Sequence, residues 1–428
     1  MSAAGGTEGA GADRRGQISW AMFDWANSPY TTLITTFVFS AYFAKAVVGD
    51  EVEGQALWGY TNSIAMFVVA SLSPVFGAVA DAGGPRKPFL AFFTFLCAVG
   101  SSLLWFATPD RAAIPLAMTF VVVGTVGFEF GTVFYNAMLG DIASKEKLGR
   151  LSGWAWGLGY VGGLTALVIA LFGFVQTEKP LFGLDKASLE NVRVVGPLCG
   201  IWLAVFSLPL FLWTPDRPTR TREVGRAIKE GLASLAHTFR NLRAQANTLR
   251  FMIAAMIYLD GLITVFAIGG IYAAGIHKMS FQEIIVFGIA LQFTAGLGAF
   301  GFAWLDDWIG SKKAAALAVA GLFVAGLGAV LADDKAWFWF WGQCFGIFGG
   351  PAQAASRSLL SRLAPDDVRT EFFGLYALTG KATAFTGPAL VGIITAASGS
   401  QRWGLAVTLV FFAVGLGLLL GVKEPARK

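Results

Sequence analysis

The sequence of 428 residues is 55% apolar and only 14% charged, whereas an average soluble protein has about 25% charged residues. This composition excludes a soluble multidomain enzyme, a disordered chain, a disulfide scaffold and an outer-membrane barrel. The predicted fold class is therefore an all-α integral membrane protein. Twelve transmembrane helices of about 20 residues each would account for the apolar fraction. The net charge of +5 has to be interpreted together with the topology.

The apolar runs predict six membrane spans, a polar segment, and six further spans. The expected spans are 18–47, 56–80, 88–107, 112–141, 150–173, 196–213, 250–275, 281–304, 312–332, 336–360, 370–397 and 402–422. The first span is long enough to require a tilt or a kink, for which Pro29 supplies a cause. The predicted domains are a disordered tail at 1–17, a six-helix half at 18–213, a linker with an amphipathic helix at 214–249, a second six-helix half at 250–422, and a tail at 423–428.

Lysine and arginine residues are distributed unequally between the two sides of these spans. If the N-terminus is cytoplasmic, its side carries 22 of the 32 basic residues and the opposite loops carry 8. By the positive-inside rule, this difference places both termini and the linker in the cytoplasm. We therefore expect a multi-pass protein of a bacterial inner membrane and no nucleic-acid partner, because the basic charge is explained by topology.

Two loops repeat between the halves. Residues 81–87 and 307–313 both follow the pattern D-x-x-G-x-(K/R)-K, 226 residues apart. The loop at 139–153 likewise aligns with 360–374 at an offset of 221. The sequence thus predicts two pseudo-symmetric six-helix halves in parallel orientation, an arrangement typical of secondary transporters with a site at the interface of the repeats.

Four stretches of the sequence resemble those of a known family. The stretch Gly77-x-x-x-Asp81-x-x-Gly84-x-Arg86-Lys87 is similar to the cytoplasmic signature of the major facilitator superfamily. Three further strings resemble the vacuole-effluxer-like branch of that superfamily, whose fungal vacuolar relatives are implicated in amino-acid export: Asp24-Trp-Ala-Asn-Ser28, Phe134-Tyr-Asn136 and Glu371-Phe-Phe-Gly-Leu-Tyr-Ala-Leu-Thr-Gly-Lys381. The resemblance implies a twelve-span transporter that works by alternating access.

Among the ionisable residues inside predicted spans, four stand out as candidates, because a charge at the bilayer centre costs about 2.5–3.5 kcal/mol on insertion scales. Asp24 and Glu129 belong to polar stripes at helical spacing, which must face protein or a water-filled cavity. By resemblance, spans one, four, seven and ten line the central cavity. The predicted substrate- or ion-binding residues are Asp24, Asn27, Glu129, Asn136, Asp260 and Lys381. The alternative is an internal ion pair of Lys381 with Asp260 or Glu129 that only holds helices together.

The two repeated loops are predicted to act as gates. A glycine permits a tight reversal, an aspartate can accept hydrogen bonds from a helix N-terminus or pair with arginine, and the basic residues can contact anionic headgroups. The predicted gating residues are Gly77, Asp81, Gly84, Arg86, Asp307, Gly310 and Lys312. The alternative is that both loops are simply tight turns.

The leading function is a secondary active transporter for a small polar solute, with an amino acid favoured, in which a carboxylate near the midplane permits proton coupling. With only three Cys and two His residues, the sequence indicates no metal site, no cofactor and no catalytic residues. The expected partners are the solute, protons and membrane lipids, with the chain as a monomer. A receptor or scaffold built on a transporter fold is the alternative function, and a membrane-embedded enzyme is a weaker one.

Overall fold

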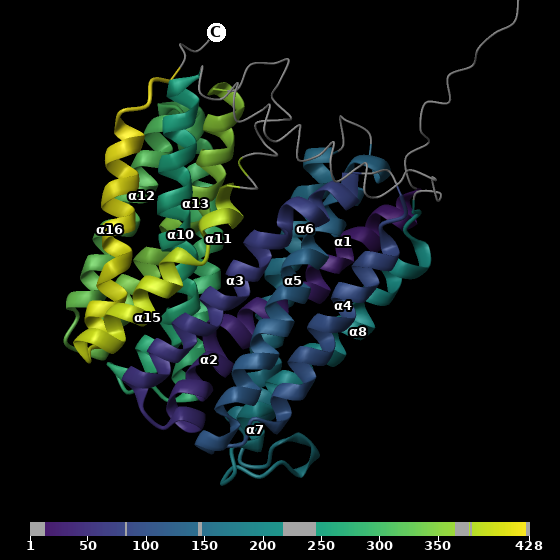
Figure 1. Cartoon of the computed structure of the whole chain (residues 1–428), viewed down its shortest axis with the longest axis vertical. Helices are drawn as coiled ribbons and strands as arrows, with labels where there is room; N and C mark the ends of the chain where they lie inside the picture. Colours follow the sequence, from purple (N-terminus) through teal and green to yellow (C-terminus); the bar gives the residue numbers. More distant parts are fainter. Residues whose placement is uncertain are drawn as a thin grey trace, which may run out of the picture.

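The computed structural model describes residues 13–81, 84–143, 148–216, 245–363, 376 and 379–424. Most of the predicted linker, the first twelve residues of the predicted N-terminal tail and residues 425–428 lie outside these ranges. Within them the chain folds into helices joined by short turns (Figure 1).

The first group of helices contains the first six predicted spans. Its elements are α1 (Arg14–Pro29), η1 (Tyr30–Phe37), α2 (Val38–Tyr42), η2 (Phe43–Val48), α3 (Glu51–Asp81), α4 (Lys87–Leu103), η3 (Leu104–Phe106), η4 (Arg111–Ala113), α5 (Ile114–Ile142), α6 (Leu148–Ile169), η5 (Ala170–Val175), η6 (Leu181–Gly183), α7 (Glu190–Arg193) and α8 (Val195–Trp213). We call this group the N-terminal half.

The second group, the C-terminal half, contains the last six predicted spans. Its elements are α10 (Ala246–Gly275), α11 (Phe281–Ile309), α12 (Ser311–Leu331), α13 (Lys335–Leu363), α15 (Thr386–Ser398) and α16 (Gln401–Leu420). Ten helical stretches of the described chain are long and apolar enough to cross a membrane. The remaining predicted spans, the tenth and the eleventh, correspond to α13 and to the segment that includes α15, so the structure is consistent with twelve spans.

Local sequence signals explain where several helices begin and end. Asp13 is the N-cap of α1, and its carboxylate accepts a hydrogen bond from the Gly16 N–H at 2.7 Å. Ser280 and Glu283 form a reciprocal capping box at the start of α11, the arrangement that satisfies two free N–H groups at once. These caps lie at the membrane-proximal ends of apolar segments, so hydropathy and capping agree on the boundaries.

The first span departs from regular α-helix at the position that the sequence singles out. After Pro29 the backbone becomes π-helical over Tyr30–Phe37, and it is π-helical again over Phe43–Val48. Proline removes one backbone donor and disturbs the preceding turn. The predicted irregularity is therefore present, in the form of wide helical turns that begin directly after the proline.

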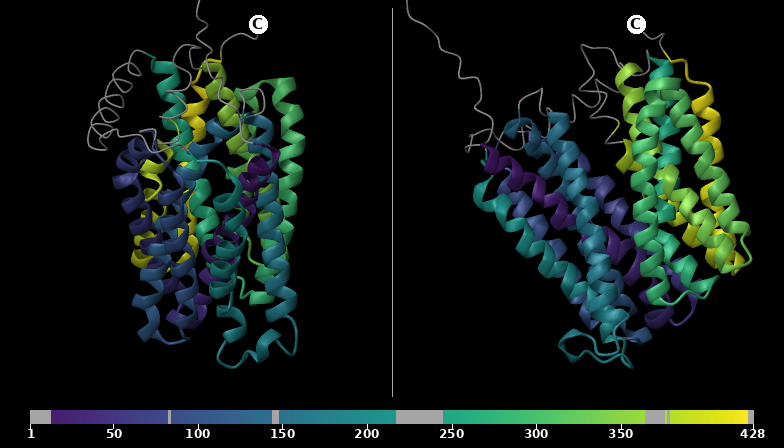
Figure 2. Two further views of the ribbon diagram at one scale, coloured as in Figure 1. Left: turned by 90° about the vertical axis from the view of Figure 1, so that its right-hand side faces the viewer. Right: turned by 180° about the vertical axis from the view of Figure 1, so that it is seen from behind.

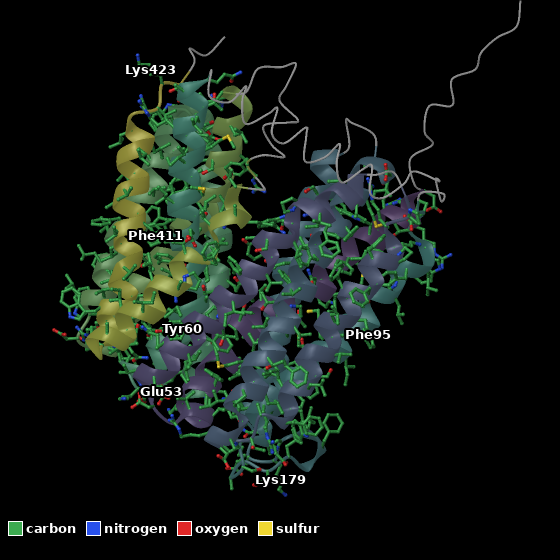
Figure 3. All side chains as sticks on the ribbon, in the orientation of Figure 1. Glu53, Tyr60, Phe95, Lys179, Phe411 and Lys423 are labelled. Atoms are coloured by element: carbon green, nitrogen blue, oxygen red, sulfur yellow. The ribbon has the colours of Figure 1, made fainter. Side chains whose placement is uncertain are left out.

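The outer surface of the helices is apolar. Phe95 on α4 is 62% exposed and points away from its neighbours (Figure 3), and Phe92, Ile201 and Val410 are also exposed. Charged side chains such as Lys423, Glu53 and Lys179 lie at the two ends of the helices. Such a distribution fits a protein whose flanks contact lipid and whose ends contact water.

The two halves meet at one end of the molecule and diverge toward the other. We call the end where α1 begins and α16 ends the terminal end, and the opposite one the far end. In Figures 1 and 2 the halves come together at the far end and separate toward the terminal end. A hydrophobic cluster contains residues of both halves, such as Phe37, Trp58, Ile268 and Tyr272, whereas two other clusters each lie within one half.

Candidate functional site

Glu129 and Lys381 form an ion pair that connects the two halves. Glu129 lies midway along α5, and the Lys381 Nζ is 3.0 Å from its Oε2. The Lys381 ammonium also donates to the Glu129 backbone carbonyl at 3.4 Å. The Glu129 side chain is 19% exposed and the Lys381 side chain is 27% exposed. The pair is therefore accessible rather than sealed in a core, and of the two sequence-predicted partners for Lys381 the structure selects Glu129.

Asp24 and Asn27 lie on α1, facing α5. Asp24 is half-buried and interacts with the phenol of Tyr135. The amide of Asn27 is buried and donates to the Thr132 hydroxyl at 3.5 Å. These two residues thus lie between α1 and α5, inside the N-terminal half, and among the described residues no hydrogen bond or ion pair joins them to the Glu129–Lys381 pair.

The remaining polar residues of these stripes behave in different ways. Ser28, Thr31 and Thr35 each donate to a carbonyl of their own helix, at 2.8 to 3.0 Å. This local bonding satisfies hydroxyl groups in an apolar environment without a partner helix. Asn136, one turn beyond Thr132 on α5, is exposed. The predicted stripe therefore contains both satisfied hydroxyls and an accessible amide.

Among the described residues, no hydrogen bond or ion pair joins Asp260 to Glu129 or Lys381. Asp260 lies on α10 with only 3% of its surface exposed, and its Oδ2 accepts the Gly387 N–H at 3.2 Å. Its Oδ1 is buried and has no hydrogen-bond partner among the described residues. This carboxyl group joins α10 to the start of α15 within the C-terminal half, and it has one oxygen free to interact with a proton or a cation.

Neutral polar groups fasten the halves together at the far end. The Gln55 amide on α3 donates to the Thr395 hydroxyl at 2.9 Å and to the Gln401 carbonyl at 3.1 Å. The Gln401 amide donates back to the Glu51 carbonyl at 2.8 Å. Gln55, Thr395 and Gln401 are each at most 2% exposed. Buried hydrogen bonds of this kind are costly to leave unmade, so they stabilise the closed far end.

Close backbone contacts accompany these hydrogen bonds. A Cβ atom added to Gly59 on α3 would stand 2.6 Å from the Pro388 carbonyl oxygen and 3.0 Å from the Gly392 Cα on α15. The Trp58 indole donates to the Ala267 carbonyl at 2.9 Å, which ties α3 to α10. At the far end, α3 and α15 therefore approach each other so closely that a side chain at position 59 would clash.

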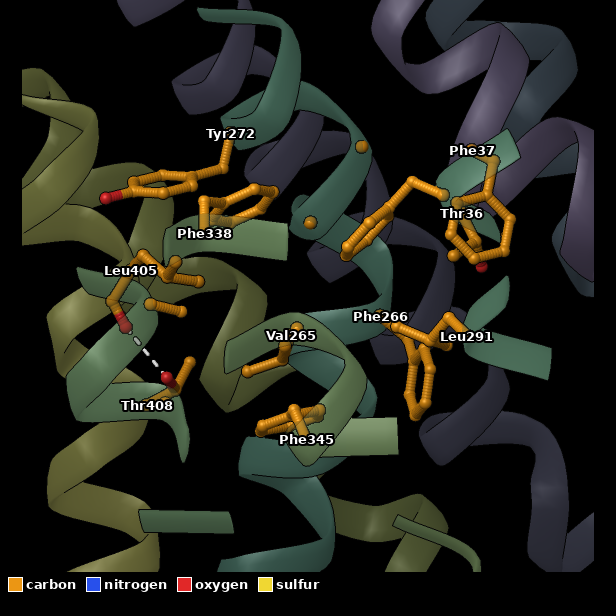
Figure 4. A pocket seen from close by; sticks show the side chains of 16 residues that line it. Thr36, Phe37, Val265, Phe266, Tyr272, Leu291, Phe338, Phe345, Leu405 and Thr408 are labelled. Atoms are coloured by element: carbon orange, nitrogen blue, oxygen red, sulfur yellow. Dashed lines mark hydrogen bonds between the residues drawn. The ribbon is translucent and has the colours of Figure 1, made fainter. Parts of the chain in front are cut away.

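An apolar cavity of about 60 Å³ lies between α10, α11 and α13 (Figure 4). Its lining includes Phe266, Leu291, Phe338 and Phe345, and the Thr408 hydroxyl is already hydrogen-bonded to the Leu405 carbonyl. A cavity with such walls offers no group to bind a charge. We therefore do not assign it to a polar solute.

The first repeated loop is held by charges of its own half. The Arg86 side chain is buried, forms an ion pair with Asp141 and donates to the Ala137 carbonyl. The carboxylate of Asp216, just after α8, accepts the backbone N–H groups of Arg86 and Lys87, both at 2.9 Å. The loop thus ties together the terminal ends of α4, α5 and α8.

The second loop repeats this arrangement in the C-terminal half. Glu424, just after α16, accepts the Lys312 N–H at 3.3 Å and forms an ion pair with Arg362 at 3.5 Å. The Lys312 ammonium donates to the Leu420 carbonyl at 2.9 Å, as Lys87 does to Phe211. Sequence reasoning missed Asp216 and Glu424, although an acidic residue a few positions after the last span of each half was a visible signal.

One loop glycine has a backbone conformation that suits a tight turn. Gly310 has φ +97° between α11 and α12, a region that favours glycine. Gly84 follows residues outside the described ranges, and its role in a tight reversal stays a prediction. It precedes Pro85, which restricts the preceding residue to extended conformations. The Gly77 backbone is helical with open space at its Cβ position. The side chains of Asp81 and Asp307 lie outside the described residues.

Within the described ranges, no group of three or more His, Cys, Asp or Glu side chains could hold a metal ion. The described part of the chain forms two helical halves with an accessible ion pair between them, a closed far end, and loops at the terminal end that are stabilised by charges. What such an arrangement can do is bind a charged solute between the halves.

Comparison with known proteins identifies the family. The model of the family described as "Vacuole effluxer Atg22 like" matches residues 42–150 and 145–427. The chain belongs to this family. The uncharacterized MFS-type transporter YxiO of Bacillus subtilis is 24% identical over 95% of this chain and 94% of its own length. Autophagy-related protein 22 of Coccidioides immitis is 22% identical over 89% of this chain and 75% of its own length.

Solved structures share the fold of this Atg22-like chain. A bacterial homologue of the human lysosomal transporter Spinster, in an inward-facing and unoccupied conformation, matches with a TM-score of 0.74 at 15% identity, covering 97% of this chain and 100% of that one. The xylose transporter XylE from E. coli, in an inward open conformation, has a TM-score of 0.65 at 15% identity over 96% of this chain and 97% of its own. The protein is a multi-pass membrane transporter of the major facilitator type.

Proposed function

We propose that this Atg22-like protein is a secondary active transporter that moves a small polar solute, with an amino acid as the favoured class, by alternating access. The observation that carries the proposal is the Glu129–Lys381 pair, which spans the two halves and stays partly exposed. Every transport cycle that moves one half against the other must strain or break this contact. A solute that replaces it would couple binding to that movement.

A zwitterion matches the chemistry of the pair. Its ammonium group can replace Lys381 at Glu129, while its carboxylate can receive the Lys381 ammonium. Each charge of the solute then meets an opposite charge in a region of low dielectric, where an unpaired charge is expensive. This argument favours an amino acid over a sugar or an alkane-like solute, and it assigns opposite ends of the solute to the two halves.

We place both termini in the cytoplasm of a bacterial inner membrane, so that the terminal end faces inward. The excess of basic residues on that side supports this orientation, and Arg86, Lys87, Lys312 and Arg362 all lie there. The structure then represents an inward-facing state. The described loops with Arg86 and Lys312 serve as gating elements in this proposal, because they tie helix ends within each half and allow each half to move as a unit.

We further propose a proton as the coupling ion, with Asp260 as its carrier. The support is the buried carboxyl group on α10, of which one oxygen has no partner among the described residues. The transporter relatives favour this function over that of a membrane-embedded enzyme. For the receptor alternative, the structure offers no specific observation.

Counterflow of radiolabelled L-amino acids in proteoliposomes tests the proposal. We expect Glu129→Gln and Lys381→Gln each to lower transport at least tenfold, because each removes one charge that the solute needs. The double variant Glu129→Gln/Lys381→Gln separates this role from a structural ion pair. If the pair only holds helices together, removing both charges restores activity; if it binds solute, the double variant stays inactive.

The matched control is the pair formed by Lys335 and Glu283 at 2.6 Å, which joins the start of α13 to the start of α11 within the C-terminal half. Lys335→Gln should leave counterflow unchanged. Wild-type protein that moves no amino acid at all, or a double variant with normal transport, would contradict the proposed site.

A further inference from the structure

A second cation from the C-terminal half faces the N-terminal half. Arg357 lies on α13, six residues before the helix ends at Leu363, so it is roughly 9 Å inside the terminal end of that helix. Its guanidinium carbon is 5.3 Å from the ring centroid of Trp156 on α6. This contact is a cation–π interaction between the halves.

Arg357 differs from the other membrane-embedded cation in having no acidic partner. Lys381 pairs with Glu129, whereas Arg357, among the residues that the structure describes, forms neither an ion pair nor a hydrogen bond. Ionisable side chains within membrane spans are costly and normally pair with one another or with backbone. An arginine left without such a partner in a transporter is therefore available for a ligand.

The surroundings of Arg357 are aromatic and accessible. Arg357 is exposed, Trp156 is 45% exposed and Tyr160, one turn further along α6, is 37% exposed. The phenols of Tyr160 and Tyr376 are the groups that interact electrostatically with the guanidinium. Neither of these two neighbours is a carboxylate, and among the described residues Arg357 forms no ion pair.

The geometry favours a carboxylate as the ligand. The Arg357 guanidinium lies over the indole ring of Trp156, and among the described residues its N–H groups donate no hydrogen bond. Those donors match the two oxygens of a carboxylate. Trp156 thus orients the guanidinium, and a hydroxyl such as that of Tyr160 can donate a further hydrogen bond to the bound oxygens.

We propose that Arg357, oriented by Trp156 and accompanied by Tyr160, binds the carboxylate group of the transported solute. The site lies nearer the terminal end than the Glu129–Lys381 pair does, so a solute that enters or leaves there meets Arg357 on its way. This inference rests on the proposed transport function. It narrows the substrate class to carboxylates, and it disfavours amines, amides and sugars of similar size.

The test compares each transported amino acid with its carboxamide in proteoliposome counterflow. Wild-type protein should prefer the acid. Arg357→Gln should raise the KM for the acid roughly ten- to hundredfold, the range expected for losing a hydrogen-bonded charge pair, and leave the KM for the amide almost unchanged. Arg357→Lys should lie between the two, because it keeps the charge but loses the planar pair of donors.

The matched control is Arg250→Gln, which removes an arginine near the same end whose hydrogen bond among the described residues goes to the Gly421 carbonyl. It should leave the acid-to-amide preference unchanged. Trp156→Leu should weaken the preference, and Trp156→Phe should retain more of it. If Arg357→Gln transports acid and amide with the wild-type ratio, the inference is overturned while the proposed function stands. If wild-type protein transports neither compound of any pair, both are overturned.

Discussion

The two ends of the molecule are held together in different ways. At the far end the halves contact each other through buried neutral hydrogen bonds, such as Gln55 to Thr395, through glycine backbones, and through the ion pair of Lys278 with Glu51 at 3.1 Å. At the terminal end the described ion pairs, Arg86–Asp141 and Arg362–Glu424, each lie within one half. The far end therefore decides whether the halves stay together, and the terminal end keeps each half intact.

This difference between the two ends indicates which contacts must break when the conformation changes. Opening the far end requires buried neutral groups to lose partners, each at a cost of about 1–3 kcal/mol. Charged clamps inside each half need not break, so the halves can move as rigid bodies. Closing the terminal end then only requires that the helix ends approach one another.

The most disruptive test acts on the glycine contact of the far end. Gly59→Leu should force α3 away from α15, because even a Cβ atom would lie 2.6 Å from the Pro388 oxygen. We expect the closed far end to lose about 3 kcal/mol, the upper range for overpacking. A cysteine at Ala56, which is 4% exposed, should then react with a membrane-impermeant maleimide after replacement of the three native cysteines.

The control for this experiment is Gly417→Leu on α16, where an added Cβ atom meets nothing within 4 Å. It should leave the cysteine at position 56 unreactive. Equal labelling in the Gly59 and Gly417 variants would show that the far end is not closed by this contact.

A smaller effect is expected from the hydrogen bonds beside that glycine. Gln55→Leu leaves the Gln401 carbonyl without its amide donor and removes the bond to Thr395. The closed far end should lose roughly 1–3 kcal/mol, which is visible as faster maleimide labelling at position 56. Asn62→Leu is the control, because the Asn62 amide bonds only to the Trp58 carbonyl of its own helix. Unchanged labelling in Gln55→Leu would show that these hydrogen bonds do not stabilise the closed far end.

At the terminal end, breaking a clamp should affect stability rather than access. Asp216→Ala removes the acceptor of two backbone N–H groups at the start of α4. We expect a loss of about 1–2 kcal/mol, typical of a lost helix cap, and a lower Tm. Far-end labelling should not change. If Asp216→Ala instead exposes position 56, the two ends are not independent in the way described.

The smallest effect concerns pH at the far end. His277 is buried against Phe338, with ring centroids 4.3 Å apart, and burial together with the nearby Arg402 lowers its pKa to about 4. Between pH 6.5 and 4 the unfolded chain binds a proton at this histidine that the folded chain does not. The folded state is therefore least stable at the acidic end of this range. Wild-type protein should have a lower Tm at pH 5 than at pH 7.5, and His277→Phe should reduce that difference; an identical pH dependence in the variant would contradict it.

The sequence predicts the helices well because long apolar runs and caps such as Asp13 are local signals. It also places Glu129 and Lys381 in spans, since the cost of a buried charge is independent of its partner. It does not reveal that these two residues, 252 positions apart, form the pair, because Asp260 was an equally good partner by composition. Only the packing of the halves decides between them.

Other features were beyond sequence reasoning for physical reasons. Gln55 is neutral and lies near a span end, so neither hydropathy nor charge marks it as buried between halves. The contacts of Asp216 and Glu424 could not be predicted, because the sequence does not show which helix ends are adjacent. The gating and solute roles of the predicted residues stay proposals.

The central claim is that closing one end opens the other, with the contact of Glu129 and Lys381 between them. Spin labels at Thr108 and Ser398 report the far end, and labels at Arg15 and Lys423 report the terminal end; all four positions are exposed. Double electron–electron resonance should give a short far-end and a long terminal-end distance in the wild type. In Gly59→Leu the far-end distance should lengthen while the terminal-end distance shortens. A terminal-end distance that stays the same while the far end opens would contradict the account.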